Sequence, residues 1–146
     1  MKDLHSKVKR TVAIGCAVLS ADNTPAAIDL QGYDSAEILL DIGVGGITFS
    51  GTNKIEFVLT HSDDDSTYTA VTLADMLGLA SVGSGGIIKA LTSAHAAAAV
   101  YRFGYKGNKR YLKLLADFSG THGSGTPIAA SALLGNGFSN PQADQA

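Results

Sequence analysis

The chain has 146 residues, of which 45% are hydrophobic, 11 are basic and 13 are acidic, so its formal net charge is −2. This length corresponds to about one domain and is enough to bury a hydrophobic core without stabilising cross-links. The near-balance of charge argues against the broad basic surface of a nucleic-acid-binding protein, and no apolar run approaches the ~18 residues of a membrane-spanning helix.

Glycine is abundant, with 17 residues, whereas tryptophan is absent and only 16% of the residues are charged. This composition is typical of many short strands joined by tight turns. The single cysteine, Cys16, lies in an apolar stretch and is expected to be a buried structural thiol. Because the N-terminus lacks the apolar region of a signal peptide, we expect the protein to fold in the cytoplasm where it is made.

The first ten residues are polar and basic, and we expect them to form a flexible arm ahead of a domain that spans 11–135. The arm carries four cations that can contact an acidic partner surface or remain solvated: Lys2, Lys7, Lys9 and Arg10. These four are the candidate contact residues. Nucleic-acid binding by so short a basic segment is the less favoured alternative.

Short apolar segments bounded by turn-forming residues predict the first strands. They lie at 12–19, 28–31, 35–42 and 54–61. Ile55, Phe57 and Leu59 alternate with Glu56, Val58 and Thr60, so the last of these strands is predicted to be half-buried. A strand at 68–71 is expected to pair back with it across the turn 62–66, which makes a hairpin with an acidic tip.

The segment 72–77 predicts at most one short helix, with Thr72 as its N-cap and Gly78 as its C-cap. A glycine-rich break at 83–86 precedes another apolar segment at 87–91. The alanine-rich segment 94–100 has helical propensity, but aromatic alternation follows it at once. We therefore expect a loop or the start of a strand there.

The run 101–118 predicts a β-hairpin around a short turn of Lys106, Gly107 and Asn108. Tyr101, Phe103 and Tyr105 share one face of its first strand, because side chains of the same parity point the same way. In its second strand the even-numbered residues 112–118 form an all-apolar face that would close over a core.

A glycine-rich connection at 119–127 leads to a last strand at 128–134, and 136–146 is expected to be a loose tail. The chain therefore contains about eight short strands and almost no helix. This pattern predicts an all-β fold, an antiparallel β-sandwich or jelly roll. Open sheets of this kind leave strand edges that are commonly covered by association.

The acidic turn invites a metal-site interpretation, because Asp63, Asp64 and Asp65 beside Ser66 offer oxygen ligands of the kind that Ca²⁺ prefers. Their spacing does not fit an EF-hand loop, so a solvated hairpin tip is favoured. The histidines are expected to be unrelated surface residues, because none shows the spacing of a zinc site: His5, His61, His95 and His122.

No stretch matches a catalytic motif. The glycine strings at 43–46 and 83–86 lack the Lys-Ser/Thr of a phosphate-binding loop, and 83–86 also lacks the fifth position of a nucleophile elbow. We expect no catalytic residue, no metal and no cofactor, and the chain is not predicted to be an enzyme.

The aromatic residues of 101–105 leave two alternatives open. With Arg102, Lys106, Lys109 and Arg110 nearby they can form a stacking surface for single-stranded nucleic acid or sugar. The favoured alternative is that the rings pack the sheet while the basic residues lie at an exposed turn.

Three stretches together resemble a family of small proteins encoded beside the major capsid protein of tailed bacteriophages and prophages, the capsid decoration or cement proteins. They are DLQGYDSAEILLDIG at 29–43, KIEFVLTHSDDDSTYTAV at 54–71 and YRFGYKGNKRYLKL at 101–114. Their order and spacing cover roughly the whole predicted fold. None of these motifs is catalytic, so they specify structure better than role.

The resemblance implies a β-sandwich or jelly-roll subunit on the virion exterior, made in the bacterial host cytoplasm, that binds an assembled head at capsomer junctions. Its implied partners are the major capsid protein and further copies of itself, in a trimer by family analogy or in a dimer, with neither DNA nor membrane. We expect Lys2, Lys7, Lys9 and Arg10 to contact the capsid or a neighbouring subunit.

Two other roles remain open because fold does not settle function. A head–tail connector or tail-associated protein can use the same small β fold, and its low copy number would distinguish it. A carbohydrate-binding module on the virion surface would instead expose Tyr101, Phe103 or Tyr105.

Overall fold

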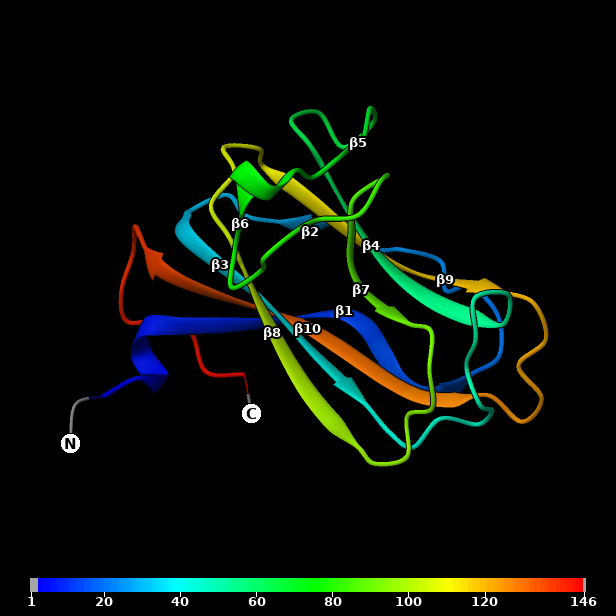
Figure 1. Cartoon of the computed structure of the whole chain (residues 1–146). Coiled ribbons are helices and arrows are strands. Elements are labelled where there is room, and N and C mark those ends of the chain that lie inside the picture. Colours follow the sequence, from blue (N-terminus) through cyan, green and yellow to red (C-terminus); the bar gives the residue numbers. More distant parts are fainter. Residues whose placement is uncertain (1–2, 146) are drawn as a thin grey trace.

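The computed structural model describes residues 3–145 and consists of two antiparallel sheets packed face to face (Figure 1). The sequence thus predicted the fold class correctly. The described chain contains ten strands and two 3-10 turns: η1 (His5–Lys7), β1 (Val8–Leu19), β2 (Ile28–Asp29), β3 (Tyr33–Ile42), β4 (Lys54–Ser62), β5 (Thr69–Ala70), η2 (Leu73–Asp75), β6 (Met76–Leu77), β7 (Ile87–Leu91), β8 (Ala99–Tyr105), β9 (Tyr111–Ser119) and β10 (Thr126–Gly137). None of its helical segments is long and apolar enough to cross a membrane.

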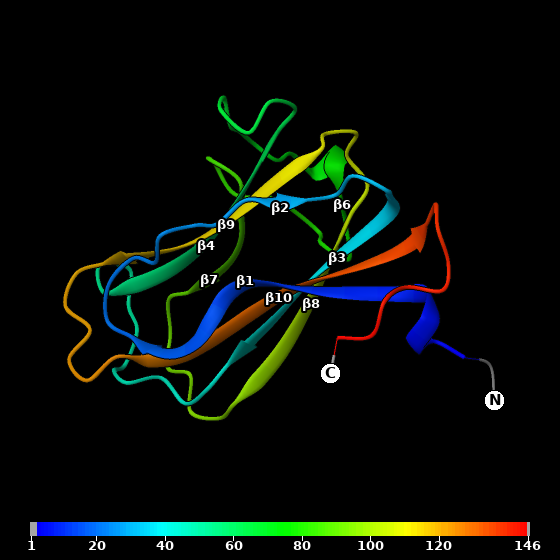
Figure 2. The same ribbon diagram turned by 180° about the vertical axis from the view of Figure 1, so that it is seen from behind.

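Five strands form what we call sheet A, in the order β1-β10-β3-β8-β6. The long strand β10 lies between the edge strand β1 and β3, so strands from the two ends of the chain lie side by side along one edge of the sheet (Figure 2). This pairing makes 8–19 and 126–137 part of the sandwich itself.

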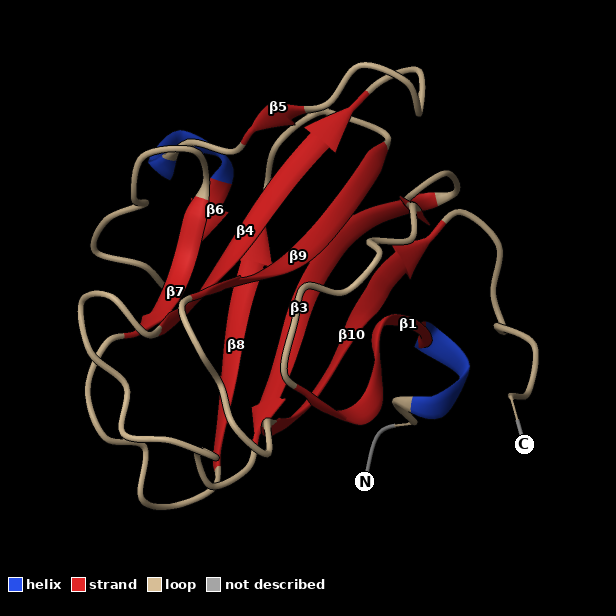
Figure 3. Ribbon diagram, turned by 90° about the vertical axis from the view of Figure 1, so that its right-hand side faces the viewer, coloured by secondary structure: helices blue, strands red, loops and turns tan. Residues whose placement is uncertain are grey.

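The remaining strands form sheet B, in which β2, β9 and β4 are neighbours in that order. Both β5 and β7 pair with the far side of β4, at its end and at its beginning respectively. Figure 3 shows β4 and β9 of this sheet crossing over the strands of sheet A. The predicted pairing of 68–71 with 54–61 is confirmed, because Thr69 and Ala70 pair with His61 and Thr60.

The core fills the space between the sheets with one parity of residues from each strand. Ile38, Leu40 and Ile42 point into it from β3, and Ile55, Phe57 and Leu59 point into it from β4. Strict alternation in both strands is what the period of two requires when one sheet face is covered. The half-buried strand predicted at 54–61 is therefore confirmed.

The predicted hairpin at 101–118 is wrong. β8 belongs to sheet A, where it pairs with β3 and β6, whereas β9 belongs to sheet B, where it pairs with β2 and β4. Residues 106–110 cross from one sheet to the other. The apolar parity of each strand was read correctly, but the same alternation suits two strands that face each other across a core.

Contacts at this crossing hold the two sheets together. The buried Tyr105 hydroxyl lies 2.9 Å from Nδ1 of His61 in sheet B and accepts a bond from the Lys109 amide at 3.2 Å. Gly107 sits over the Tyr105 ring, where an added Cβ would lie 2.4 Å from the hydroxyl oxygen. A side chain at this position would require the buried Tyr105 ring or the linker to shift, so glycine lets the linker pass close over the tyrosine.

The N-terminal end also differs from the prediction of an arm at 1–10. β1 begins at Val8, and Lys9 and Arg10 pair with Leu134 and Leu133 of β10. The sequence did not predict a strand here because Lys9 and Arg10 are charged, whereas strand pairing uses the backbone and does not require apolar side chains. Lys2 lies outside the described residues.

The segment after β10 contacts the free side of β1. The Gln145 side chain accepts from the Arg10 amide and donates to the Arg10 carbonyl, both at 2.8 Å. The Gln142 amide donates to the Ser6 carbonyl at 2.9 Å. Part of the segment predicted as a loose tail therefore acts as an edge cover, and β10 itself extends to Gly137.

Two smaller expectations also differ. Cys16 is exposed, because two register shifts in β1, at 12–14 and 14–17, break the alternation that the sequence pattern assumes. The helix predicted at 72–77 is a single 3-10 turn, η2, in which the Thr72 amide and hydroxyl donate to Asp75 at 2.8 and 2.7 Å, and η1 adds a second turn.

Candidate interaction surface

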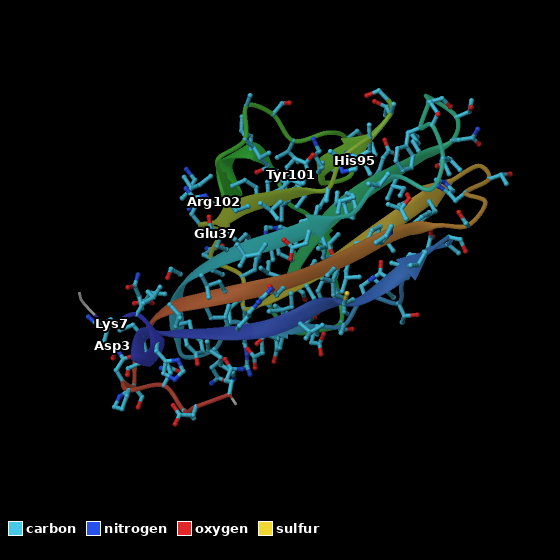
Figure 4. All side chains as sticks on the ribbon, turned by 90° about the horizontal axis from the view of Figure 1, so that it is seen from below. Asp3, Lys7, Glu37, His95, Tyr101 and Arg102 are labelled. Carbon is cyan, nitrogen blue, oxygen red and sulfur yellow. The ribbon has the colours of Figure 1, made fainter. Side chains whose placement is uncertain are left out.

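The two outer faces of the sandwich differ in chemistry, and the face of sheet A is the more apolar. Residues that alternate with its core positions form what we call the A face: Arg10, Val12, Glu37, Leu39, Asp41, Val100, Arg102, Ala129, Ser131 and Leu133. Figure 4 views the molecule from the side of this face. Val12 and Val100 are 66% and 79% exposed, well above what a covered sheet face shows.

Two shallow hollows indent the A face. One, of about 340 Å³, lies where β8, β3, β10 and β1 approach one another and is lined by Cys16, Asp41, Val100 and Ala129 among others. The second, of about 420 Å³, is lined by Val12, Gly15 and Cys16. Cys16 lines both, so the exposed thiol lies between the two hollows, on the edge strand β1.

The charges of the A face are few and balanced. Arg102 reaches Glu37 on the neighbouring strand at 3.5 Å (Figure 4). Nε of Arg10 donates to the Ser131 hydroxyl at 2.8 Å. Asp41 is half-buried and makes neither an ion pair nor a side-chain hydrogen bond with any described residue. The face therefore presents one unused carboxylate in apolar surroundings.

The outer face of sheet B is polar by comparison and its charges are mostly paired. Lys54 lies 2.8 Å from Glu56, and Lys113 lies 3.7 Å from Asp65. The Lys113 ammonium also sits 4.1 Å from the centre of the Tyr68 ring. A surface of this kind is well solvated and satisfies its own charges.

The predicted basic contact residues do not form one patch. Lys7 is exposed in η1, and Arg10 lies on the A face. Lys9 has the opposite parity and lies near Asp29, where it contributes, after the bidentate Arg110, to a lowered pKa of that carboxyl. Lys9 and Arg10 are adjacent in sequence but lie on opposite faces, because side chains alternate along a strand.

The acidic tip is organised by its own hydrogen bonds. Asp64 accepts bonds from the Thr67 amide, the Ser62 hydroxyl and the Ser66 amide, which lower its pKa to about 2. Asp63 pairs with Lys109, and Asp65 accepts from the Tyr68 hydroxyl. Within the described part of the chain no cluster of His, Cys, Asp or Glu is arranged to hold a metal ion.

Two of the four histidines are buried, so the expectation of surface histidines is wrong for them. His61 continues the inward parity of Ile55, Phe57 and Leu59, a signal that the sequence already carried. His122 packs edge-on against Phe118, with ring centres 4.7 Å apart, and its Nε2 lies 2.8 Å from the Ser119 carbonyl.

The aromatic residues of β8 pack against the sandwich. Phe103 and Tyr105 are each 5% exposed, and the partly buried Tyr101 stacks on Phe103 with ring centres 6.4 Å apart. Lys89 covers the Tyr101 ring at 4.3 Å. The favoured packing interpretation is confirmed for these rings.

No protein-family model and no curated protein sequence matches the chain. Among solved structures, it is similar to the crystal structure of the SPBc2 prophage-derived protein YomS, with 8% sequence identity and a TM-score of 0.47. The similarity covers 91% of this chain and 98% of that one. A TM-score below 0.5 establishes neither a shared family nor a shared function.

Proposed function

We propose that this protein is a structural protein of a tailed-phage virion that decorates the outside of the head and stabilises the junctions between capsomers. The A face is the observation that carries the proposal. Val12 and Val100 are exposed on this face, with the partly exposed Leu39 and Leu133 on the strands between them, and exposed apolar side chains gathered on one sheet face suit an interaction site. A decoration protein functions through such contacts alone. The resemblance of 29–43, 54–71 and 101–114 to that family supports the same role.

The chain offers two separate surfaces for such a role. The A face suits association between protein subunits, because it is apolar and carries little net charge. The basic N-terminal segment suits an acidic shell surface, because the described residues offer the Lys7 ammonium no ion pair. A protein that binds only the assembled head stabilises it by mass action.

Copy number on particles tests the proposal. Purified phage heads that carry the protein are reconstructed by electron cryomicroscopy, and the copies are counted from the density. We expect occupancy of capsomer junctions over the whole head. A single ring at one vertex would instead identify a head–tail connector. The carbohydrate-binding alternative gains no support from β8, because Phe103 and Tyr105 are buried.

Charge substitutions test the proposed contact with the shell. Deleting 1–10 would remove three residues of β1, so point variants are the cleaner choice. We expect Lys7→Glu with Lys9→Glu to reduce rebinding of purified protein to heads that lack it. The control is Lys106→Glu, which changes an exposed cation in the crossing between the sheets. Undiminished rebinding of the first variant would refute the role of this segment.

A further inference from the structure

We propose that the A face binds the A face of a second copy about a two-fold axis, with Arg102 of each copy reaching Asp41 of the other. The inference rests on the proposed function only for the biological role of the dimer, because the contact itself is argued from the face. It also predicts a dimer in place of the trimer that family analogy implies.

The positions of the two residues satisfy the geometric requirement of a two-fold contact. Leu39 pairs with Arg102, and Asp41 pairs with Val100, so Arg102 and Asp41 are diagonal neighbours on adjacent strands. Such neighbours lie about 7–8 Å apart. In a two-fold interface every contact from one residue to a second is repeated in reverse. An axis that passes between these two residues therefore makes both ion pairs at once.

Each member of the pair has capacity left for a partner. The Arg102 side chain is 78% exposed, and its ion pair with Glu37 is made by one terminal nitrogen at 3.5 Å. Because a guanidinium carries five N–H donors, most remain free. Asp41 is half-buried beside Val100 and Ala129 and has no cation among the described residues. A cation from a second copy would satisfy it in surroundings from which water is largely excluded.

The charge of the whole face favours a second copy over a strongly charged partner. Its two carboxylates, Glu37 and Asp41, are balanced by two cations, Arg10 and Arg102. A face without net charge meets its own copy without overall repulsion, whereas it offers a highly charged partner little attraction. The exposed Val12 and Val100 lie near opposite edges of this face and supply apolar contact.

The size of the face sets the expected affinity. Four strands at a spacing of about 4.8 Å and about eight residues along each give roughly 500 Å² per copy. The total of about 1,000 Å² lies at the lower limit for a specific protein–protein interface. We therefore expect a dimer that dissociates on dilution.

The test uses the full-length purified protein without phage heads, so its failure is distinguishable from failure of the head-binding role. Analytical ultracentrifugation over a dilution series should show a monomer–dimer equilibrium. Asp41→Arg and Arg102→Asp each oppose like charges twice across the axis, and each should weaken dimerisation about tenfold or more. The double variant that exchanges the two charges should restore it.

Two controls keep the result interpretable. Lys113→Asp reverses a charge on the outer face of sheet B and should leave dimerisation unchanged. Circular dichroism shows whether each charge variant is folded. If one is not, a second measurement on the wild-type protein takes the place of that variant: the rate at which a maleimide modifies Cys16. That rate should fall as the protein concentration rises into the dimer range, because Cys16 lines both hollows of the A face.

Several results would overturn the inference. A wild-type protein that stays monomeric at its highest soluble concentration, or that forms trimers, excludes the two-fold contact. A folded double variant that fails to recover dimerisation excludes the Arg102–Asp41 pairs. A Cys16 modification rate that does not change with concentration excludes the A face.

Discussion

Replacement of Asn23 by alanine tests how the free edge of sheet B is satisfied. β2 pairs with β9 only at Tyr111 and Leu112. Farther along β9, the Asn23 side chain takes the place of a strand, accepting from the Ala116 amide at 2.7 Å and donating to the Leu114 carbonyl at 3.2 Å. Asn23→Ala therefore leaves one N–H and one C=O of a core strand without a partner.

The expected loss of stability in Asn23→Ala follows from how deeply the two unpaired backbone groups are buried. An unsatisfied backbone group costs about 1–3 kcal/mol when buried. Asn23 is half-buried, so water can reach the vacated site and the lower end of this range applies to each group. We expect a loss of about 2 kcal/mol in the free energy of unfolding, a large share of the ~5–15 kcal/mol typical of a domain.

Urea unfolding followed by circular dichroism measures this loss. The midpoint should fall while the m-value is unchanged, because the compactness of neither state is altered. Thermal unfolding should show a Tm lower by about 5–8 °C. Asn108→Ala, at an exposed asparagine, is the matched control and should change stability by less than about 0.5 kcal/mol. A similarly small effect of Asn23→Ala would refute the edge-capping argument.

Two further predictions concern pH. Hydrogen bonds from the Thr67 amide, the Ser62 hydroxyl and the Ser66 amide lower the pKa of Asp64 from 3.8 to about 2. The stabilisation from the ionised carboxylate is therefore complete above pH ~4 and is lost as the pH falls towards 2. Asp64→Asn should flatten the decline of Tm over that range, and an unchanged slope would contradict this. The Asp144 carboxylate raises the pKa of His5 above 6.5, so this contact is present below pH 6.5 and is lost as the pH rises through the higher folded-state value. Amide ¹⁵N relaxation at Asp144 should report greater mobility at high pH in the wild type and no such change in His5→Ala.

Much of the strand pattern was determined locally. Ile55, Phe57 and Leu59 alternate strictly, and a strand with one covered face has to place such residues on the same side. The same rule located β3, β9 and β10 and the inward parity of the β8 aromatics. Short-range turn chemistry likewise located the acidic tip. These features depend only on neighbours within a few residues.

The A face was beyond reach of the sequence alone. Val12, Leu39 and Val100 come from strands far apart in the chain, and only the pairing of β1, β10, β3 and β8 brings them together. The basic residues at the start of the chain attracted attention instead, although strand alternation directs Lys9 and Arg10 to opposite faces.

The sequence by itself determined most of the strands and, in β3, β4, β8 and β9, which residues face the core, because both follow from a period of two that these strands display locally. Only the tertiary structure decided that β8 and β9 lie in different sheets and that Cys16 is exposed. The same alternating residues are buried whether β8 and β9 pair as a hairpin or lie in opposite sheets. Which arrangement forms therefore depends on long-range contacts, such as that between His61 and Tyr105.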